Sequence, residues 1–280
     1  MICLRLLFLH LATSQTTNQT SSVFTFHVHT KGNKMHLLSL NNKLAKSIAV
    51  FKVLTAGLFL APHKRSGHNV CKFAGHCSAV CNLWFSGRTV TEPVRQAMLR
   101  RTRLYFENPA EFFDFVYSDI AYLERKAIRE SKRLFIRLNG SSDLDFSQWA
   151  NEFPAVEFYD YTKWESRIEN VMQGNWPANY ALCYSFNERS NPLLCRDYLS
   201  WGGSVAMVFD TEYCPQHKRI GELPKTVKLG GKRFKIIDGD IHDLRHPDFD
   251  NPGCVVGLRF KGSRSRLPVA IEKGFVRKTR

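Results

Sequence analysis

The sequence predicts an α/β protein built on a parallel sheet, open or closed, and three observations lead to this fold class. Two amphipathic helices are indicated between residues 91 and 132. From residue 133 onward the pattern changes to short apolar runs that end in polar residues, and helix-like or turn-like segments separate several of the runs. Strands that alternate with helices favour a parallel sheet, and the ligand site of such a fold gathers at the carboxyl ends of the strands.

Both upstream helices begin with recognisable start signals. The stretch TEPVRQAMLRRTRLYF has Thr91 as a candidate N-cap and Pro93 in its first turn, and NPAEFFDFVYSDIAYLERKAIRESK begins with Asn108 and Pro109. In the second stretch apolar residues recur at helical spacing. The pattern therefore predicts one buried face, made of Phe112, Phe113, Val116, Ile120, Leu123 and Ala127.

The apolar runs that predict strands are RLFIRLNGSSD, VEFYDYTK, YALCYSFNE, SVAMVFD, FKIIDGD and CVVGLRFKG. Between them, DFSQWANEF and KWESRIENVMQGN predict helices, and Gly174 is a stop signal for the second. The polar residues at the ends of the runs predict a ring of side chains at one edge of the sheet. The ring consists of Arg137, Asn139, Ser141, Asp143, Tyr161, Thr162, Lys163, Ser185, Asn187, Glu188, Asp210, Asp238 and Asp240. For any one of them alone, a helix cap or a turn is the plain alternative.

The composition predicts one folded domain with two flanking segments. Because 44% of the 280 residues are hydrophobic and 12% are aromatic, the chain is not compositionally disordered. Residues 1–35 are expected to form an unstructured leader, with Met35 as an alternative start, and residues 36–262 the domain. No run approaches the roughly 20 apolar residues that span a bilayer, so a soluble cytoplasmic protein without membrane contact is expected.

The charge balance is strongly basic, with a net charge of +15 at pH 7. This excess suggests a polyanionic partner such as nucleic acid, or simply a basic surface. Residues 263–280 are expected to form a basic C-terminal tail, because only Glu272 offsets the cations Arg264, Arg266, Lys273, Arg277, Lys278 and Arg280.

The stretch CKFAGHCSAVC places Cys71, Cys77 and Cys81 within eleven residues, in a chain with eight cysteines. Three interpretations compete. Disulfides need an oxidising compartment and would leave one thiol to pair elsewhere. A zinc site could add His68 or His76 as a fourth ligand. An iron–sulfur cluster held by three thiolates would leave one iron open to a small molecule.

The order of several motifs resembles the gene product 88 family of phage and plasmid proteins, whose organisation is similar to that of radical S-adenosylmethionine (SAM) enzymes. The resemblance covers residues 37 to 262. Its motifs are LSLNNKLAKSIAVF, LFLAPHKRSGHNVCKFAGHCSAVC with the following SGR, RLNGSSDLD, FYDYTK, and DGDIHDLRHPD before CVVGLRFKG.

The resemblance implies a full or partial (β/α) barrel of the TIM type in which Cys71, Cys77 and Cys81 hold a [4Fe–4S] cluster. SAM would bind the fourth iron through its amino and carboxylate groups. Reduction by a flavodoxin or ferredoxin would then cleave SAM to a 5′-deoxyadenosyl radical that abstracts hydrogen from an unknown substrate, in the cytoplasm of a bacterial host. Most radical SAM enzymes use Cys-x3-Cys-x2-Cys, whereas this chain has Cys-x5-Cys-x3-Cys.

On this interpretation, the residues expected to hold SAM or line its site are Asn139, Ser141, Asp143, Thr162, Lys163, Ser185, Asn187 and Glu188. Trp84, Phe85 and Tyr161 are candidates for the walls of a dry pocket. The rival hypothesis is a basic, zinc-stabilised protein that binds nucleic acid through its basic surface and tail and has no catalytic activity.

Overall fold

The computed structural model describes residues 35–40, 42–85, 89, 91–211 and 221–279. Residues 1–34 of the predicted leader and the SGR motif at residues 86–88 therefore lie outside the described residues. Met35–Arg280 forms one unit, which is described below.

Ten strands form the sheet, in the order β1-β2-β3-β4-β5-β6-β9-β8-β7, with β10 paired to β6 off this path. Among the described strands only β1–β2 and β7–β8 pair antiparallel, and over these residues the sheet is not closed. The predicted parallel α/β sheet is thus confirmed, and the six predicted runs are β3 to β6, β8 and β9. The strand bounds are β1 (Leu38–Ser39), β2 (Leu54–Leu58), β3 (Leu134–Arg137), β4 (Glu157–Thr162), β5 (Tyr180–Ser185), β6 (Ser204–Asp210), β7 (Thr226–Leu229), β8 (Lys232–Asp238), β9 (Val255–Arg259) and β10 (Val276–Lys278).

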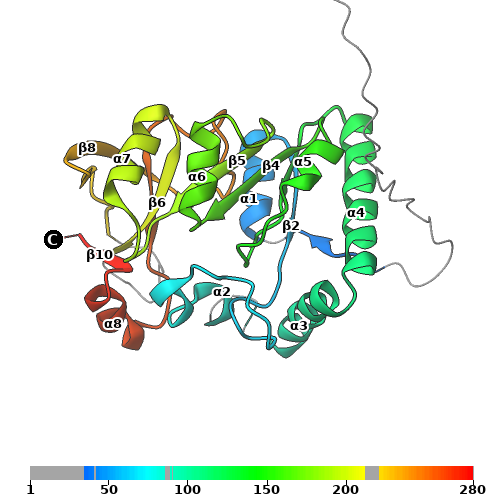
Figure 1. The fold of residues 1–280 in the computed structure, drawn as a ribbon, viewed down its shortest axis with the longest axis horizontal. Coiled ribbons are helices and arrows are strands. Elements are labelled where there is room, and N and C mark those ends of the chain that lie inside the picture. The colour runs from blue at the N-terminus through cyan, green and yellow to red at the C-terminus, as the bar shows by residue number, and fades with distance from the viewer. Residues whose placement is uncertain (1–34, 41, 86–88, 90, 212–220, 280) are drawn as a thin grey trace, which may run out of the picture. The chain divides into compact units, whose positions relative to one another are not determined.

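Eight α-helices and two 3-10 helices are described in full (Figure 1). Both predicted upstream helices are present as α3 and α4, and the Asn108 side chain caps α4 by accepting a hydrogen bond from the Glu111 backbone N–H at 3.4 Å. The bounds are α1 (Asn42–Phe51), α2 (Asn82–Phe85), α3 (Glu92–Glu107), α4 (Pro109–Arg129), α5 (Gln148–Glu152), α6 (Glu165–Met172), α7 (Pro192–Trp201) and α8 (Leu267–Glu272), with the 3-10 helices η1 (Gly75–Ser78) and η3 (Arg264–Arg266).

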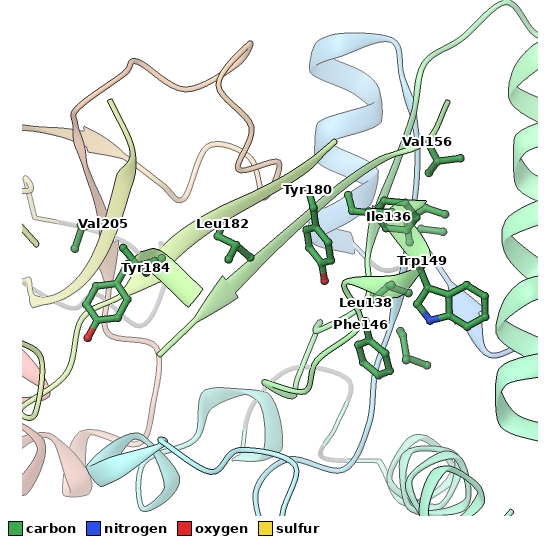
Figure 2. Packing of buried hydrophobic residues seen from close by; sticks show 14 of the residues in the cluster. Ile136, Leu138, Phe146, Trp149, Val156, Tyr180, Leu182, Tyr184 and Val205 are labelled. Atoms are coloured by element: carbon green, nitrogen blue, oxygen red, sulfur yellow. The ribbon is translucent and has the colours of Figure 1, made fainter. Parts of the chain in front are cut away.

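Helices α4 to α7 cover one face of the sheet, and their apolar sides form the largest core cluster with alternate strand residues. Figure 2 shows part of this cluster, with Ile136 and Leu138 near Trp149 and Phe146. The opposite face carries a smaller cluster in which Leu44 of α1 packs with Phe135. Neighbouring residues 135 and 136 thus serve opposite faces, as the two-residue period of a strand requires.

The segment predicted as a basic tail packs against the domain. Strand β10 runs parallel to β6, with Val276 opposite Val208. Phe275 and Val276 share an apolar cluster with Val80, and Cys77 packs against it. Arg266 donates a hydrogen bond to the carbonyl of Ala79 at 2.9 Å, so the segment covers part of the loop that carries the three thiols.

Within the part of the chain that the structure describes, no helix is both long enough and apolar enough to cross a bilayer.

Candidate functional site

A cavity of about 250 Å³ lies at the carboxyl edge of the sheet. Residues that follow β2, β3, β4, β5, β8 and β9 line it, so the predicted gathering of strand ends is present. All three predicted cysteine ligands line the cavity, Cys71, Cys77 and Cys81. Five of the eight predicted SAM-site residues do so as well, namely Asn139, Ser141, Asp143, Lys163 and Ser185.

The three thiols lie on the long connection that leaves the carboxyl end of β2. Cys77 is in η1 and Cys81 directly precedes α2. The Cys71 sulfur accepts a hydrogen bond from the backbone N–H of His63 at 3.4 Å. The backbone N–H groups of Leu83 and Trp84 lie near enough to the Cys81 sulfur to lower its pKa, and that of Trp84 donates to the Cys81 carbonyl at 3.2 Å. Donors of this kind favour the thiolate, which is the metal-binding form of cysteine.

Burial works against these donors. Together with the neighbouring Cys77, it raises the pKa of the Cys71 thiol to about 12 and that of Cys81 to about 11. A thiol with such a pKa is protonated and unreactive at neutral pH. A bound cation reverses this balance, because a coordinated thiol is deprotonated outright. The backbone N–H groups thus favour the thiolate form, whereas burial favours the protonated thiol. A bound cation would offset the effect of burial.

The two histidines proposed as zinc ligands point to other partners. The His68 ring stacks on Phe106 of α3, with ring centroids 4.3 Å apart. The His76 Nδ1 atom lies 3.0 Å from Glu188 Oε1. Within the described residues, no group of three or more His, Cys, Asp or Glu side chains is arranged around a single ion position. The described cysteines, Cys71, Cys77, Cys81, Cys183, Cys195 and Cys254, are free thiols.

Two predicted site residues do not line the cavity. They bind instead to the thiol loop, which is the connection between β2 and α2 that carries the three cysteines. Asn187, after β5, donates a side-chain hydrogen bond to the carbonyl of Phe73 at 3.1 Å. The carboxylate of Glu188 accepts the backbone N–H of His76 at 2.9 Å. Gly75 is required beside it, because its φ is +54° and a Cβ there would lie 2.1 Å from Glu188 Oε1. These residues position the loop.

Asp143 makes a second set of contacts that hold the thiol loop in place. Its carboxylate accepts hydrogen bonds from the Thr162 hydroxyl at 2.9 Å and the Lys163 backbone N–H at 2.8 Å, and it forms an ion pair with Arg167 at 3.0 Å. Its own N–H donates to the carbonyl of Val70, next to Cys71, at 2.8 Å. The Asp143 carboxylate and Thr162 are therefore committed to joining the ends of β3 and β4 to the thiol loop.

The turn after β3 is likewise built from its own polar residues. The Asn139 side chain donates to the carbonyl of Leu144 at 3.0 Å and accepts the N–H of the same residue at 2.8 Å. Ser141 donates to the carbonyl of Leu60 at 2.6 Å. Gly140 lies so close to β2 that a Cβ would stand 2.6 Å from the Leu58 carbonyl oxygen. Asn139 and Ser141 thus shape the wall that they line.

Lys163 and Ser185 are different, because their polar ends meet inside the cavity. The Lys163 ammonium donates to the Ser185 hydroxyl, and its Nζ lies 3.4 Å from the Ser185 carbonyl oxygen. Both side chains are half-buried. Among the eight predicted SAM-site residues, this pair combines exposure to the cavity with groups that can bind a carboxylate or an amine.

Sequence reasoning missed part of the polar wall. The cavity is also lined by Lys46 of α1, by Arg259 at the end of β9 and Lys261 after it, and by Asp243 after β8. Lys46 lies in a helix whose pattern carries no strand-end signal, and Arg259 is still within its strand. Arg259 pairs with Asp238 at 2.8 Å and Asp240 at 3.2 Å, so these two predicted residues neutralise a cation of the wall.

The three aromatic residues predicted to form the walls of a dry pocket lie in two different places. Tyr161 lines the cavity, and the guanidinium of Arg137 lies 4.7 Å from its ring centre. Trp84 is in the core cluster where α2 meets α3, and Phe85 packs against it.

His242 supplies a neutral hydrogen-bonding group to the cavity. Its Nδ1 lies 2.9 Å from the Arg245 guanidinium, which can only donate, so Nδ1 is the acceptor. Burial, with help from Arg245, lowers the pKa of His242 to about 4, although Asp243 opposes the shift. The imidazole is therefore uncharged at neutral pH.

Because the pKa of His242 is lowered in the folded protein, acidification should reduce the stability of the fold. An unfolded His242 binds a proton near pH 6.5, whereas the folded one does so only near pH 4, so the free energy of unfolding falls as pH decreases through this window. Between pH 7 and pH 4.5 the free energy of unfolding should therefore fall by about 2 kcal/mol less in His242→Gln than in the wild type. Urea denaturation at the two pH values measures this difference. The raised pKa of Asp250 acts in the opposite direction in both proteins. Identical pH profiles for the two proteins would contradict the assignment.

Fold and cavity together define a class: an open, largely parallel α/β protein with a three-thiol cavity at the carboxyl edge of its sheet. A family model described as Gene product 88 matches residues 29–279, and the chain belongs to that family. The family that the sequence motifs indicated is thus confirmed. Searches of curated proteins and of solved structures gave no match.

Proposed function

We propose that the protein is a radical-SAM-like iron–sulfur protein in which Cys71, Cys77 and Cys81 hold a [4Fe–4S] cluster and the adjoining cavity binds SAM. The observation that supports this most is that Cys71, Cys77 and Cys81 line one cavity at the strand ends, where Cys81 is buried, Cys71 and Cys77 are half-buried, and the Cys71 sulfur accepts a backbone N–H. Three thiolates leave one iron of such a cluster without a protein ligand. When bound and reduced, the cluster would supply the electron that cleaves SAM.

The open sheet supports the fold part of the proposal. Helices α4 to α7 lie on one face, and residues at the carboxyl ends of the parallel strands line the cavity. A partial (β/α) barrel of the TIM type has this arrangement, with its active site at the same end of the strands. We infer that the sheet is such a partial barrel.

The protein's own residues would bind and orient SAM. Lys163 offers an ammonium for the carboxylate of SAM, and the Ser185 hydroxyl offers an acceptor for its amino group. Asn139 and Asp143 hold the wall between this pair and Cys71. Phe260 and Phe275 line the same cavity and would limit access of water. The electron donor would be a flavodoxin or ferredoxin, and the site of action the cytoplasm of the bacterial host.

Anaerobic incubation of cluster-reconstituted protein with SAM and dithionite tests the proposal. We expect methionine and 5′-deoxyadenosine to form together, as measured by mass spectrometry. The variant with Cys71, Cys77 and Cys81 all changed to Ala should form neither product. Reconstituted protein that contains its full complement of iron and forms neither product would contradict the proposed activity.

The iron-loaded protein should bind SAM through the ammonium group of Lys163. Hydrogen bonds to charged groups contribute about 1.5–3 kcal/mol, so Lys163→Met should weaken SAM binding by about 10-fold or more. Lys225→Met, which removes an exposed lysine near β7, should leave the Kd unchanged. Isothermal titration of the iron-loaded proteins measures both constants. Equal SAM affinity in the wild type and the Lys163 variant would remove this lysine from the site.

A further inference from the structure

The chain between residues 62 and 103 is unusually rich in cations. It contains eight Lys and Arg residues, and its only acidic residue is Glu92. One of the eight, at position 88, lies outside the described residues. The segment includes the thiol loop and most of α3, so the positive charge is concentrated next to the cavity.

Five cations of this segment have exposed side chains: Lys64, Arg65, Lys72, Arg100 and Arg103. Within the described chain, none of the five forms an ion pair with a carboxylate. Some cations elsewhere do so, for example Arg133 with Glu157 and Arg196 with Asp197, so the five differ from these in charge compensation. We call these five exposed cations of the thiol loop and α3 the basic face. Its uncompensated charge suits a polyanion with closely spaced phosphates.

An exposed aromatic pair lies within the basic face. Phe106, at the end of α3, is 38% exposed, and its ring stacks on His68 of the thiol loop with an interplanar angle of 10°. The pair joins the loop that carries Lys64 to the helix that carries Arg103. Aromatic rings interleaved with cations are typical of surfaces that bind unpaired bases and their phosphates.

The basic face is continuous with the cavity. Lys72 directly follows Cys71, and Arg65 lies over the ring of Phe85 at 4.9 Å, beside Cys81. Helices α2 and α3 share an apolar cluster with Cys81 and lie along one side of the sheet (Figure 1).

We propose that single-stranded nucleic acid docks on the basic face, with its phosphates on the five cations and a base on the Phe106–His68 pair. Docking there places one nucleotide at the mouth of the thiol cavity. The inference names the substrate class of the proposed function, and its catalytic meaning rests on that function. An acidic peptide has the charge but lacks the planar bases that the aromatic pair would stack.

Fluorescence anisotropy with a labelled oligothymidylate on the full chain tests the docking. One variant combines Lys64→Ala, Lys72→Ala and Arg100→Ala. A charge-matched control combines Lys225→Ala, Lys228→Ala and Arg233→Ala on the exposed side of β7 and β8. Removing three phosphate contacts should make the slope of log K against log salt shallower by about 2, and weaken binding by about 10-fold or more at low salt, only in the first variant.

Phe106→Ala separates stacking from charge. It should weaken binding by about 5-fold or more at every salt concentration and leave the slope unchanged. Equal losses in the two triple variants would overturn the proposal. Tighter binding of duplex DNA, or displacement of the oligothymidylate by poly-L-glutamate at matched charge, would also overturn it.

Iron and sulfide analysis of the same samples keeps the two proposals apart. Cluster-free protein that binds oligothymidylate with this pattern would support the docking while the cluster assignment fails. Iron-loaded protein that cleaves SAM but does not bind the oligonucleotide would overturn the docking and leave the proposed function intact.

Discussion

Replacing Asp143 by Ala should lower the free energy of unfolding by about 3–5 kcal/mol, because the change leaves Arg167 as a buried cation without its carboxylate. Asp143 is 7% exposed and Arg167 is 5% exposed, so water cannot easily replace the lost partner. The Thr162 hydroxyl and the Lys163 N–H lose their acceptor at the same time. Urea denaturation monitored by tryptophan fluorescence measures the loss.

The Asp143 variant should also retain less iron after reconstitution, since the loop that carries Asp143 is bonded to Val70 beside Cys71. Asp114→Ala is the matched control, because Asp114 is exposed on α4 and its removal should change stability by no more than about 0.5 kcal/mol. A loss in the Asp143 variant no larger than in this control would show that the contacts of Asp143 do not hold the site together.

The largest effect on the cofactor is expected from single changes of the cavity cysteines. Cys71→Ala, Cys77→Ala and Cys81→Ala should each reduce the visible absorption of the reconstituted protein to background, because each thiolate would bind a different iron of the cluster. Cys183→Ala is the control. Cys183 is fully buried in a core cluster with Ala206 and Val256 and does not line the cavity.

These four variants distinguish a cluster site from chance crowding of thiols. If Cys183→Ala lost as much absorption as the cavity variants, the loss would reflect damaged folding. If two of the three cavity variants kept full absorption, Cys71, Cys77 and Cys81 would not be the ligand set.

The sequence predicted the central part of the fold because its strands are short, apolar and punctuated by polar ends. The six predicted runs did not include β1, β2, β7 and β10. In β7, Val227 and Leu229 alternate with the exposed Thr226 and Lys228 on an antiparallel edge, where a strand needs little apolar character. The three residues of β10 depend on pairing with β6, a contact between distant parts of the chain that no local pattern encodes.

Part of the candidate site could also be predicted from the positions of residues at the ends of the strands. Strand-end position placed Lys163 and Ser185 at the cavity, because parallel strands share one carboxyl edge. Position alone could not separate residues that face the cavity from those that hold its loops. Glu188 and Thr162 are committed to other parts of the protein by hydrogen bonds that arise only in the folded chain. Lys46 was missed because its helix meets the sheet edge only through tertiary packing.

The most direct test of the central claim is metal and sulfide analysis, with a UV–visible spectrum, of the full chain reconstituted without oxygen. The account predicts about four irons and four sulfides per chain and a broad brown absorption that dithionite bleaches. The variant that lacks all three cavity cysteines should show neither. One zinc per chain without sulfide would contradict the account and favour a zinc-stabilised, nucleic-acid-binding protein.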